Sequence, residues 1–387
     1  MKIAFVTTQS LLQPTLIGRI IPIANELSKK GNEVTVLIHE EQNSSPPSSP
    51  KKGEGLRIVS TGKNPFTRTD TGKKRQRGIR LAWTLCKNAV HAARALIQLR
   101  PEVIVIVKPL PENVFAVCLA RIFLRKTKLV LDVDDFELFA NVVSSLLERI
   151  MLHWSERMAC RISSHIIVAT PFLGDHMQAI SSHTNITSLI PTGYSSSAPL
   201  MPNNLAHTIL YIGSISKSSG HRVDMLPELL RDVRKEVHNA KLYIAGAGDD
   251  ELMIKNRIAE LGLTSAVTWF GRFTDSDISE IISQSTIIID PIDDSIVNRA
   301  KSSFRTMLAC AAGMPIITSN IGIRPFIIPK ELHERFFAQT GDEQSYARIC
   351  IEVLKNQLDN KETALLQHEA NSYSTEATAT MYYNCLV

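Results

Sequence analysis

The chain has 387 residues, too many for one ordinary hydrophobic core, and this length predicts two domains of roughly two hundred residues each. Hydrophobic residues make up 44% of the sequence and charged residues 21%, as in most globular proteins. The net charge of +5 is too small to predict binding to nucleic acid. Six scattered cysteines without CxxC spacing predict reduced thiols and exclude a disulfide frame or a zinc site of the usual spacing.

The first residues, MKIAFVTTQS, predict a β-strand rather than a signal peptide, because they lack the long apolar segment that a signal peptide has before its cleavage site. No run of the sequence approaches the roughly 18–20 apolar residues that a membrane span needs. The longest candidate, Val114–Leu124, is interrupted by Arg121. We therefore expect a cytoplasmic protein that associates at most peripherally with the inner face of a membrane.

The first half of the chain alternates β-branched runs with helical patterns. The Ser/Pro-rich segment Glu40–Gly55 predicts a loop, and the polar segment Ser195–His207 predicts a linker. Strands are predicted over Lys2–Thr8, Glu33–His39, Val103–Val107, Leu129–Val133 and Ile166–Ala169, and helices over Ile17–Lys30, Lys73–Arg100 and Ser144–Arg161. We expect a domain over 1–195, a linker over 196–207, a second domain over 208–370 and a C-terminal helix over 371–387.

The predicted helix Lys73–Arg100 contains eight Lys or Arg residues and no acidic residue. Apolar residues form one stripe along it, and basic residues lie along one flank of that stripe. The stripe comprises Ile79, Trp83, Cys86, Val90, Ala93 and Ile97, and the flank comprises Arg77, Arg80, Lys87, His91 and Arg94. The pattern predicts a surface helix whose stripe packs on the sheet, or a helix that docks on an anionic membrane surface, and both can hold together.

The second half of the chain contains four segments whose pattern predicts βα units: ILYIGSISKSSG, KLYIAGAGDD, VTWFGRF and IIIDPIDDSIVNRAKSSFRTMLACAAGMPIITSNIG. Each apolar β-branched run ends in a turn of glycines or small residues, which is typical of a parallel sheet with its loops at the carboxyl ends of the strands. Backbone N–H groups in such loops, and the helix N-termini that follow, form anion-binding sites.

Three of these turns carry candidate binding residues. Gly213 and Gly220 allow a close approach of the backbone to a phosphate, and Lys217 supplies positive charge, although an ordinary strand–turn–helix junction explains the same residues. Gly246 lies in a Gly-x-Gly turn. Ser302 or Ser303 is the predicted N-cap of a helix whose start is crowded by Arg299, Lys301 and Arg305, which predicts a pyrophosphate site.

The order and spacing of these blocks resemble the donor-nucleotide half of a GT-B glycosyltransferase, and AAGMPII resembles the "MAxGxPVV" segment of the large retaining group 1 / family 4 type. The resemblance implies two Rossmann-like doubly wound domains that face each other across a cleft, with the C-terminal helix returning to the first. It implies transfer of a sugar, with retention, from a nucleotide-diphosphate sugar to a hydroxyl of a glycan or lipid-linked acceptor. No metal and no tightly bound cofactor are expected.

On the donor side, the resemblance assigns the diphosphate to the 213–220 loop and to the helix start at Ser302 and Ser303. The family's Arg and Lys in that loop correspond here to Ser214 and Ser219, so Lys217 or Arg222 must substitute for them. The base is expected to contact Gly271 and Arg272, and Arg299 and Lys301 are expected to act in catalysis. Two family glutamates correspond to Ala300 and Leu308, and Leu308 cannot hydrogen-bond a ribose.

On the acceptor side, the resemblance points to Gly18 and Arg19 and to the carboxylates of LDVDDFE, which are Asp132, Asp134 and Asp135. Asp134 lies nearest to a His of many relatives, and a carboxylate there can orient an acceptor hydroxyl and accept its proton. Helix capping by Asp134 or Asp135 is the alternative. Asp132-Val-Asp134 also spells the metal-binding DxD of the other large glycosyltransferase fold, which lacks a second βα series.

Two other functions remain open. A catalytically degenerate partner subunit would explain Ala300, Leu308, Ser214 and Ser219, and a GT-B nucleotide-sugar epimerase would share the same sheet pattern.

Overall fold

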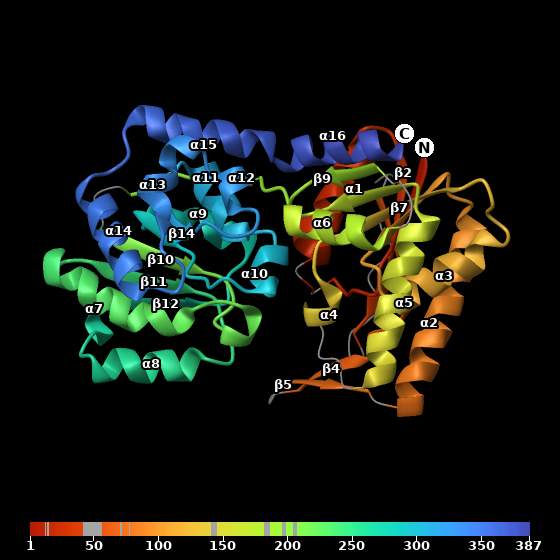
Figure 1. The fold of residues 1–387 in the computed structure, drawn as a ribbon, viewed down its shortest axis with the longest axis horizontal. Helices are drawn as coiled ribbons and strands as arrows, with labels where there is room; N and C mark the ends of the chain where they lie inside the picture. Colours follow the sequence, from red (N-terminus) through yellow and green to blue (C-terminus); the bar gives the residue numbers. More distant parts are fainter. Residues whose placement is uncertain are drawn as a thin grey trace. The chain divides into compact units, whose positions relative to one another are not determined.

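A computed structural model describes the chain except for residues 12, 14, 42–55, 70–71, 77, 141–144, 182–185, 196–198 and 204–206. Most of the loop predicted over Glu40–Gly55 and half of the linker predicted over 196–207 therefore lie outside the described residues. The chain divides into two compact units (Figure 1). Unit 1 contains Met1–Gly193 together with Thr375–Val387, and unit 2 contains Tyr194–Ser374.

Unit 1 is built on a parallel sheet of seven strands in the order β3-β2-β1-β6-β7-β8-β9. The central strands are buried on both faces, which explains why their sequences are uninterrupted apolar runs rather than alternating ones. The strands are β1 (Lys2–Val6), β2 (Glu33–Glu40), β3 (Leu56–Lys63), β6 (Val103–Val107), β7 (Lys128–Val133), β8 (His165–Val168) and β9 (Ile186–Leu189).

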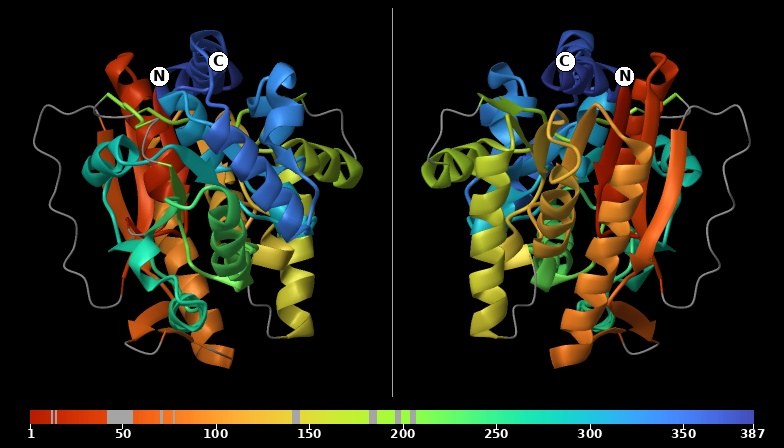
Figure 2. Two further views of the ribbon diagram at one scale, coloured as in Figure 1. Left: turned by 90° about the vertical axis from the view of Figure 1, so that its left-hand side faces the viewer. Right: turned by 90° about the vertical axis from the view of Figure 1, so that its right-hand side faces the viewer.

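Helices cover both faces of this sheet. On one face, α1 (Ile21–Lys29) and the C-terminal α16 (Thr375–Leu386) share a core with alternate residues of β1, β2 and β6. A π-helical turn, η1 (Leu16–Ile20), leads directly into α1. The right-hand view of Figure 2 shows α5 (Leu146–Ile162, yellow), α3 (Pro111–Arg121) and α2 (Gly78–Leu99, orange) side by side as one outer layer, with α3 in the middle. The short α4 (Glu137–Ala140) precedes α5, and α6 (Pro171–Ile180) follows it.

The helix predicted over Lys73–Arg100 is wrong at its start. Lys73–Arg75 belong to β5 (Gly72–Arg75), which pairs antiparallel with β4 (Phe66–Thr69), and α2 begins at Gly78. The predicted stripe is also wrong in its first half, because Ile79 is 90% exposed and Trp83 72%. The buried face is a neighbouring one that is rich in alanine and so permits close packing against α3. It comprises Leu81, Asn88, Ala89, Ala92, Ala93 and Leu96.

Unit 2 contains a second parallel sheet, in the order β12-β11-β10-β13-β14-β15. Its strands are β10 (Thr208–Ile212), β11 (Lys241–Ala245), β12 (Val267–Gly271), β13 (Ile287–Ile289), β14 (Ile316–Ser319) and β15 (Phe337–Ala338). Its helices are α7 (Leu226–Glu236), α8 (Glu251–Glu260), α9 (Asp275–Ser283), α10 (Ile296–Ala300), α11 (Phe304–Ala312), α12 (Arg324–Ile327), α13 (His333–Phe336), α14 (Glu343–Lys355) and α15 (Asn360–Ser372).

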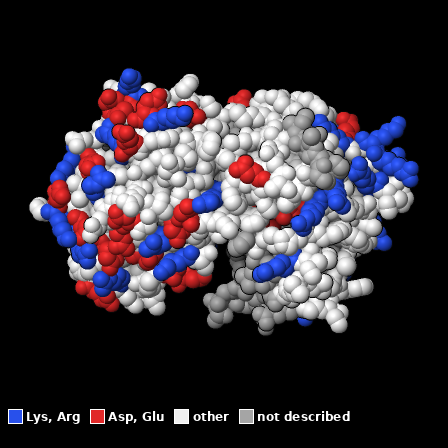
Figure 3. Space-filling model, in the orientation of Figure 1, with Lys and Arg blue, Asp and Glu red and all other residues white. Residues whose placement is uncertain are grey.

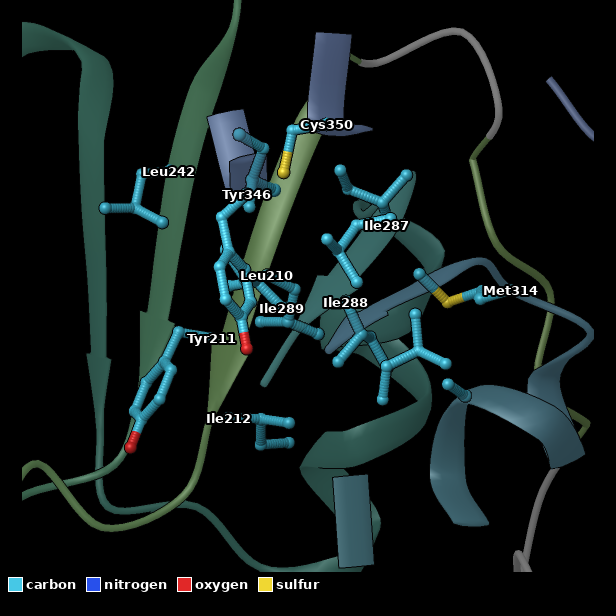
Figure 4. Packing of buried hydrophobic residues seen from close by; sticks show 14 of the residues in the cluster. Leu210, Tyr211, Ile212, Leu242, Ile287, Ile288, Ile289, Met314, Tyr346 and Cys350 are labelled. Carbon is cyan, nitrogen blue, oxygen red and sulfur yellow. The ribbon is translucent and has the colours of Figure 1, made fainter. Parts of the chain in front are cut away.

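The core of unit 2 is formed by isoleucines of β13 packed against neighbouring strands and α14. Figure 4 shows Ile287, Ile288 and Ile289 with Leu210 of β10, and Tyr346 of α14 reaching into the same cluster. Both units have a sheet in which the chain order reverses beside the first strand. The predicted class of two doubly wound α/β units is confirmed. Within the described ranges, none of the helices combines the length and apolar character needed to cross a membrane.

Candidate functional site

The candidate donor site lies in unit 2, where the strands of the parallel sheet end. β10 is followed by Gly213 (φ 139°) and β11 by Gly246 (φ 147°), and both backbone conformations favour glycine. A Cβ on Gly246 would lie 1.8 Å from the Gly213 carbonyl oxygen. The two glycines therefore let these two turns pack backbone against backbone.

A buried cluster of charges lies beside these turns. Asp290, which directly follows β13, is fully buried and accepts hydrogen bonds from Arg305 Nε (2.7 Å) and Arg324 Nε (2.8 Å). Ser303 Oγ donates to the same carboxylate at 3.1 Å. Burial by itself raises the pKa of Asp290, but attraction to the two guanidinium groups outweighs burial and holds that pKa below its ordinary value. The cluster thus keeps one more positive charge than negative.

Arg305 connects this cluster to the turn after β10. Its Nη1 donates to the Ile212 carbonyl (2.9 Å), and a Cβ on Gly213 would come within 2.5 Å of the same nitrogen. Its Nη2 lies 2.7 Å from His221 Nδ1. Burial and the Arg305 charge lower the pKa of His221 to about 2, so the ring is neutral, accepts at Nδ1 and carries its proton on Nε2.

From the sequence, Arg305 was predicted only as one of three cations that crowd a helix start. The signal that could have identified it is its place in the first turn of α11, two residues after the N-cap. Ser303 caps α11 by accepting from the Thr306 N–H, and Ser302 immediately precedes it. The prediction of one helix start is wrong for Arg299 and Lys301, because Arg299 lies in the last turn of the separate short helix α10 and Lys301 follows that helix.

The structure brings most of the predicted donor residues together. Lys301 Nζ donates to the Ser219 carbonyl (2.9 Å), and Asn298 Nδ2 donates to the Gly220 carbonyl (2.8 Å), so α10 holds the 213–220 loop. Lys217 and Arg222 both pair with Asp224, at 3.6 and 3.1 Å. The Ser214 carbonyl accepts a hydrogen bond from the hydroxyl of Tyr211, which ties the loop back to β10.

Other predicted donor residues have their contacts outside the Arg305 cluster. Arg299 is half exposed and pairs with Asp294 at 2.6 Å. Arg272 is exposed, and the carbonyl of the preceding Gly271 accepts from the Gly246 N–H (2.7 Å). Ala300 and Leu308 are fully buried, and Leu308 belongs to the apolar core of unit 2. An acidic side chain at position 308 would therefore require a different local packing.

Two predicted acceptor residues form a buried network in unit 1. Arg19, on the π-helical turn, donates Nε (3.1 Å) and Nη2 (2.9 Å) to Asp132 at the end of β7, and Nη1 to the Ile190 carbonyl (2.9 Å). Tyr382 of α16 donates its hydroxyl to the same Asp132 (3.0 Å). Gly18, one residue before Arg19, is exposed. Asp132 therefore ties the first βα connection of unit 1 to its last helix.

Replacing Tyr382 with Phe is expected to lower the free energy of unfolding of unit 1 by about 1–2 kcal/mol, because the buried Asp132 loses one of its donors. Urea unfolding of the purified variant measures this value. Tyr383→Phe is the matched control, because Tyr383 is only partly buried, and it is expected to change stability by at most about 0.5 kcal/mol. Equal losses in the two variants would contradict a role for the hydroxyl contact.

The remaining acidic residues of unit 1 surround Lys108, which sequence reasoning missed. Lys108 Nζ lies 2.8 Å from Glu137, 3.4 Å from Asp134 and 3.7 Å from Asp135. Burial lowers the pKa of Lys108, but the three carboxylates outweigh burial and raise that pKa well above its ordinary value. Lys108 has φ 66°, a strained conformation for a non-glycine residue of the kind that clusters at functional sites.

These contacts also bear on the DxD alternative. Asp132 is occupied by Arg19 and Asp134 by Lys108, so the two carboxylates do not converge on one position. Over the parts of the chain that the structure describes, no group of three or more His, Cys, Asp or Glu side chains is arranged to hold a metal ion.

Several solved structures share this fold over nearly the whole chain. Sucrose-phosphate synthase of Thermosynechococcus elongatus superposes with a TM-score of 0.73 at 15% identity, covering 99% of this chain and 98% of that chain. HepE of Anabaena, solved in complex with UDP and glucose, gives 0.70 at 13%, covering 100% and 99%. The lipopolysaccharide outer core galactosyltransferase WaaB gives 0.71 at 13%, covering 100% and 99%. At these identities the likeness shows the fold.

Sequence comparison addresses the family. An uncharacterized glycosyltransferase of Methanocaldococcus jannaschii, MJ1607, is 26% identical over 127 residues, which are 32% of this chain and only 30% of that protein's length. Residues 20–193 match the glycosyl transferase 4-like domain, and residues 202–371 match the glycosyl transferases group 1. The two matches fall on units 1 and 2 in turn and together take in most of the chain, and so the protein belongs to the group 1 / family 4 glycosyltransferases.

Proposed function

We propose that the protein transfers a sugar from a nucleotide-diphosphate sugar to a hydroxyl acceptor, with retention of anomeric configuration. The observation that carries this proposal is the position of Arg305. Its guanidinium is buried against Gly213 and His221 and pairs with Asp290, and Ser303 donates to the same carboxylate. Fixed cations at a sheet's carboxyl edge, beside a helix N-terminus, are suited to bind a diphosphate.

The chemistry that these residues supply is stabilisation of negative charge. When the sugar leaves, charge builds on the nucleoside diphosphate, and donors that are already oriented lower the barrier most. Arg305, Lys301 and the backbone N–H groups at the start of α11 are the proposed donors, and Lys217 and Arg222 stand in for the Arg and Lys that the loop lacks. Arg299 is half exposed and pairs with Asp294. We propose that these cations make a metal unnecessary.

In unit 1 we propose that Asp134 orients the acceptor hydroxyl and accepts its proton. Lys108 Nζ lies 3.4 Å from Asp134, and Asp135 and Glu137 share the same cation. Arg19 and Asp132 support this edge of the sheet from the interior, because their hydrogen bonds are made with each other, Ile190 and Tyr382.

The similar structures narrow the substrates that we propose. HepE of Anabaena was solved with UDP and glucose, and WaaB acts in the lipopolysaccharide outer core. We therefore propose a UDP-sugar donor and a glycan or lipid-linked acceptor of the cell envelope. An anionic membrane surface is a further proposed partner through α2, on which Arg80, Lys87 and Arg94 are exposed.

The rival with a specific observation behind it is a degenerate partner subunit. Ala300 and Leu308 replace two family glutamates, and both positions are closed to solvent. A thermal-shift panel with UDP, GDP and ADP separates the two proposals. A nucleotide at a hundred times its dissociation constant is expected to add about 2.7 kcal/mol of stability, a rise of several degrees.

The Arg305 assignment is tested in the same assay. Arg305→Lys keeps a charge beside Asp290 but loses the planar fork, and it is expected to weaken nucleotide binding about tenfold to a hundredfold. Arg348→Lys is the matched control, because Arg348 is exposed on α14 and pairs with Glu352. A folded wild-type sample that no nucleotide stabilises would support the degenerate subunit instead.

A further inference from the structure

The outer helix layer of unit 1 carries an unusual concentration of exposed apolar side chains, most of them on α5. Leu146 is 74% exposed and Trp154 40%, and Leu147, Ile150 and Met151 lie between them with intermediate values. Positions 146, 150 and 154 recur every four residues, and positions 147 and 151 form a second row beside them. These five side chains therefore form one stripe over the first turns of α5.

This arrangement is the reverse of an ordinary surface helix. The buried residues of α5 are Ser155, Glu156, Ala159 and Cys160, which are small or polar. Ser155 reaches inward and donates its hydroxyl to the Pro109 carbonyl at 2.7 Å. The orientation of α5 is therefore fixed by contacts to unit 1, and its largest apolar side chains remain in solvent. On the same layer, α2 exposes Ile79 and Trp83, and α3 exposes Phe115.

The exposed charges on these three helices are all positive. Their exposed ionised side chains are Arg80, Lys87, Arg94, Arg121, Arg149, Arg157 and Arg161. Of their acidic residues, Glu112 and Glu156 are buried and Glu148 is half-buried. Figure 3 shows this part of the surface, at the lower right, as uncharged side chains with scattered basic ones and no acidic ones. The layer α2–α3–α5 is thus both apolar and basic.

We propose that this layer is a docking face for an anionic lipid bilayer, with the α5 stripe inserted among the headgroups and the arginines contacting lipid phosphates. Apolar side chains and cations on one face are what an interfacial helix requires. A second copy of the chain is a poorer occupant, because a symmetric contact would bring the same seven cations together. This inference rests on the proposed membrane contact of α2 and assigns its main apolar part to α5.

Vesicle co-sedimentation of the full chain tests the proposal. Vesicles of phosphatidylcholine with about a third phosphatidylglycerol are expected to retain the protein, and vesicles of pure phosphatidylcholine to retain it poorly. Ile150→Ser with Trp154→Ser is expected to reduce binding at least tenfold. Arg149→Gln with Arg157→Gln is expected to reduce it by about fivefold per arginine. The matched control is Leu252→Ser with Met253→Ser on α8 of unit 2, where both residues are also exposed.

Failure of wild-type binding to anionic vesicles, or equal binding by the α5 variants and the α8 control, would overturn the proposal. So would a wild-type dimer in light scattering that Ile150→Ser with Trp154→Ser dissociates, because the face would then be an interface between copies. The nucleotide thermal shift, measured without vesicles on the same variants, is expected to be unchanged. It reports separately on the glycosyltransferase proposal, so either can fail while the other stands.

Discussion

Replacing Gly246 with alanine is expected to lower the free energy of unfolding of unit 2 by about 3–5 kcal/mol. Two causes act together. Gly246 has φ 147°, which an L-residue with a side chain rarely adopts, and the new Cβ would lie 1.8 Å from the Gly213 carbonyl oxygen. Because that neighbour is backbone, no rotamer change can relieve the clash, and the turns after β10 and β11 must separate.

Gly262→Ala is the control for backbone conformation alone. Gly262 has φ 70°, but a Cβ there would meet nothing within 4 Å, so the expected cost is only about 1–2 kcal/mol. Urea unfolding followed by Trp269 fluorescence measures both variants, in a background where the exposed Trp83 and Trp154 are replaced by Phe. A Gly246→Ala variant no less stable than Gly262→Ala would show that the two turns do not pack as described.

Replacing Asp290 with Asn is expected to lower the free energy of unfolding of unit 2 by about 3–5 kcal/mol. The reason is that Arg305 and Arg324 would be left buried without their counter-charge. Asp294→Asn is the matched control. Asp294 also pairs with an arginine, Arg299, but that pair is solvent-exposed, so its loss is expected to change stability little. Thermal or urea unfolding at pH 7 compares the two variants, and similar losses would contradict the buried network.

The same carboxylate also sets a pH dependence. The folded-state pKa of Asp290 is depressed, so its stabilisation is fully present above the unfolded-state pKa of about 3.9. It is lost as the pH falls from that value through the folded-state pKa. The stability difference between the wild type and Asp290→Asn is therefore expected to stay constant from pH 7 to about pH 5 and to shrink below about pH 4. A difference that changed between pH 5 and pH 7 would point to another titrating group.

The sheets were predictable because their signal is local. β6 occupies Val103–Val107, the predicted range. Five consecutive β-branched residues are typical of a strand in a parallel sheet that is buried on both faces. The turn glycines were also identified, but the stated cause was incomplete. Gly213 was assigned to a phosphate and Gly246 to a candidate binding turn, whereas the nearest atoms that a Cβ would meet belong to Arg305 at Gly213 and to the Gly213 backbone at Gly246. A requirement for glycine is visible in a sequence, and the atom that imposes it is not.

The buried charges could not be predicted from spacing. Asp290 lies 15 residues from Arg305 and 34 from Arg324, and only the pairing of β10, β13 and β14 brings them together. Lys108 meets its carboxylates for the same reason, since β6 and β7 end at the same edge. Periodicity predicted most of α2 as a helix but did not decide which face would be buried. The buried face of α2 is the alanine-rich one, because α3 packs closely on it.

The contribution of α16 to unit 1 makes that unit discontinuous along the chain. Residues 1–193 supply the whole seven-stranded sheet. The face of the sheet that α1 covers is completed only by residues 375–387. During synthesis, the ribosome must therefore produce all of unit 2 before Tyr382 can reach Asp132. Until then Ile23, Phe5 and their neighbours lack part of their apolar cover, so a nascent unit 1 remains open while unit 2 is being made. A fragment ending at residue 193 would carry the same exposed face, and grafting residues 375–387 onto it through a flexible linker would close it.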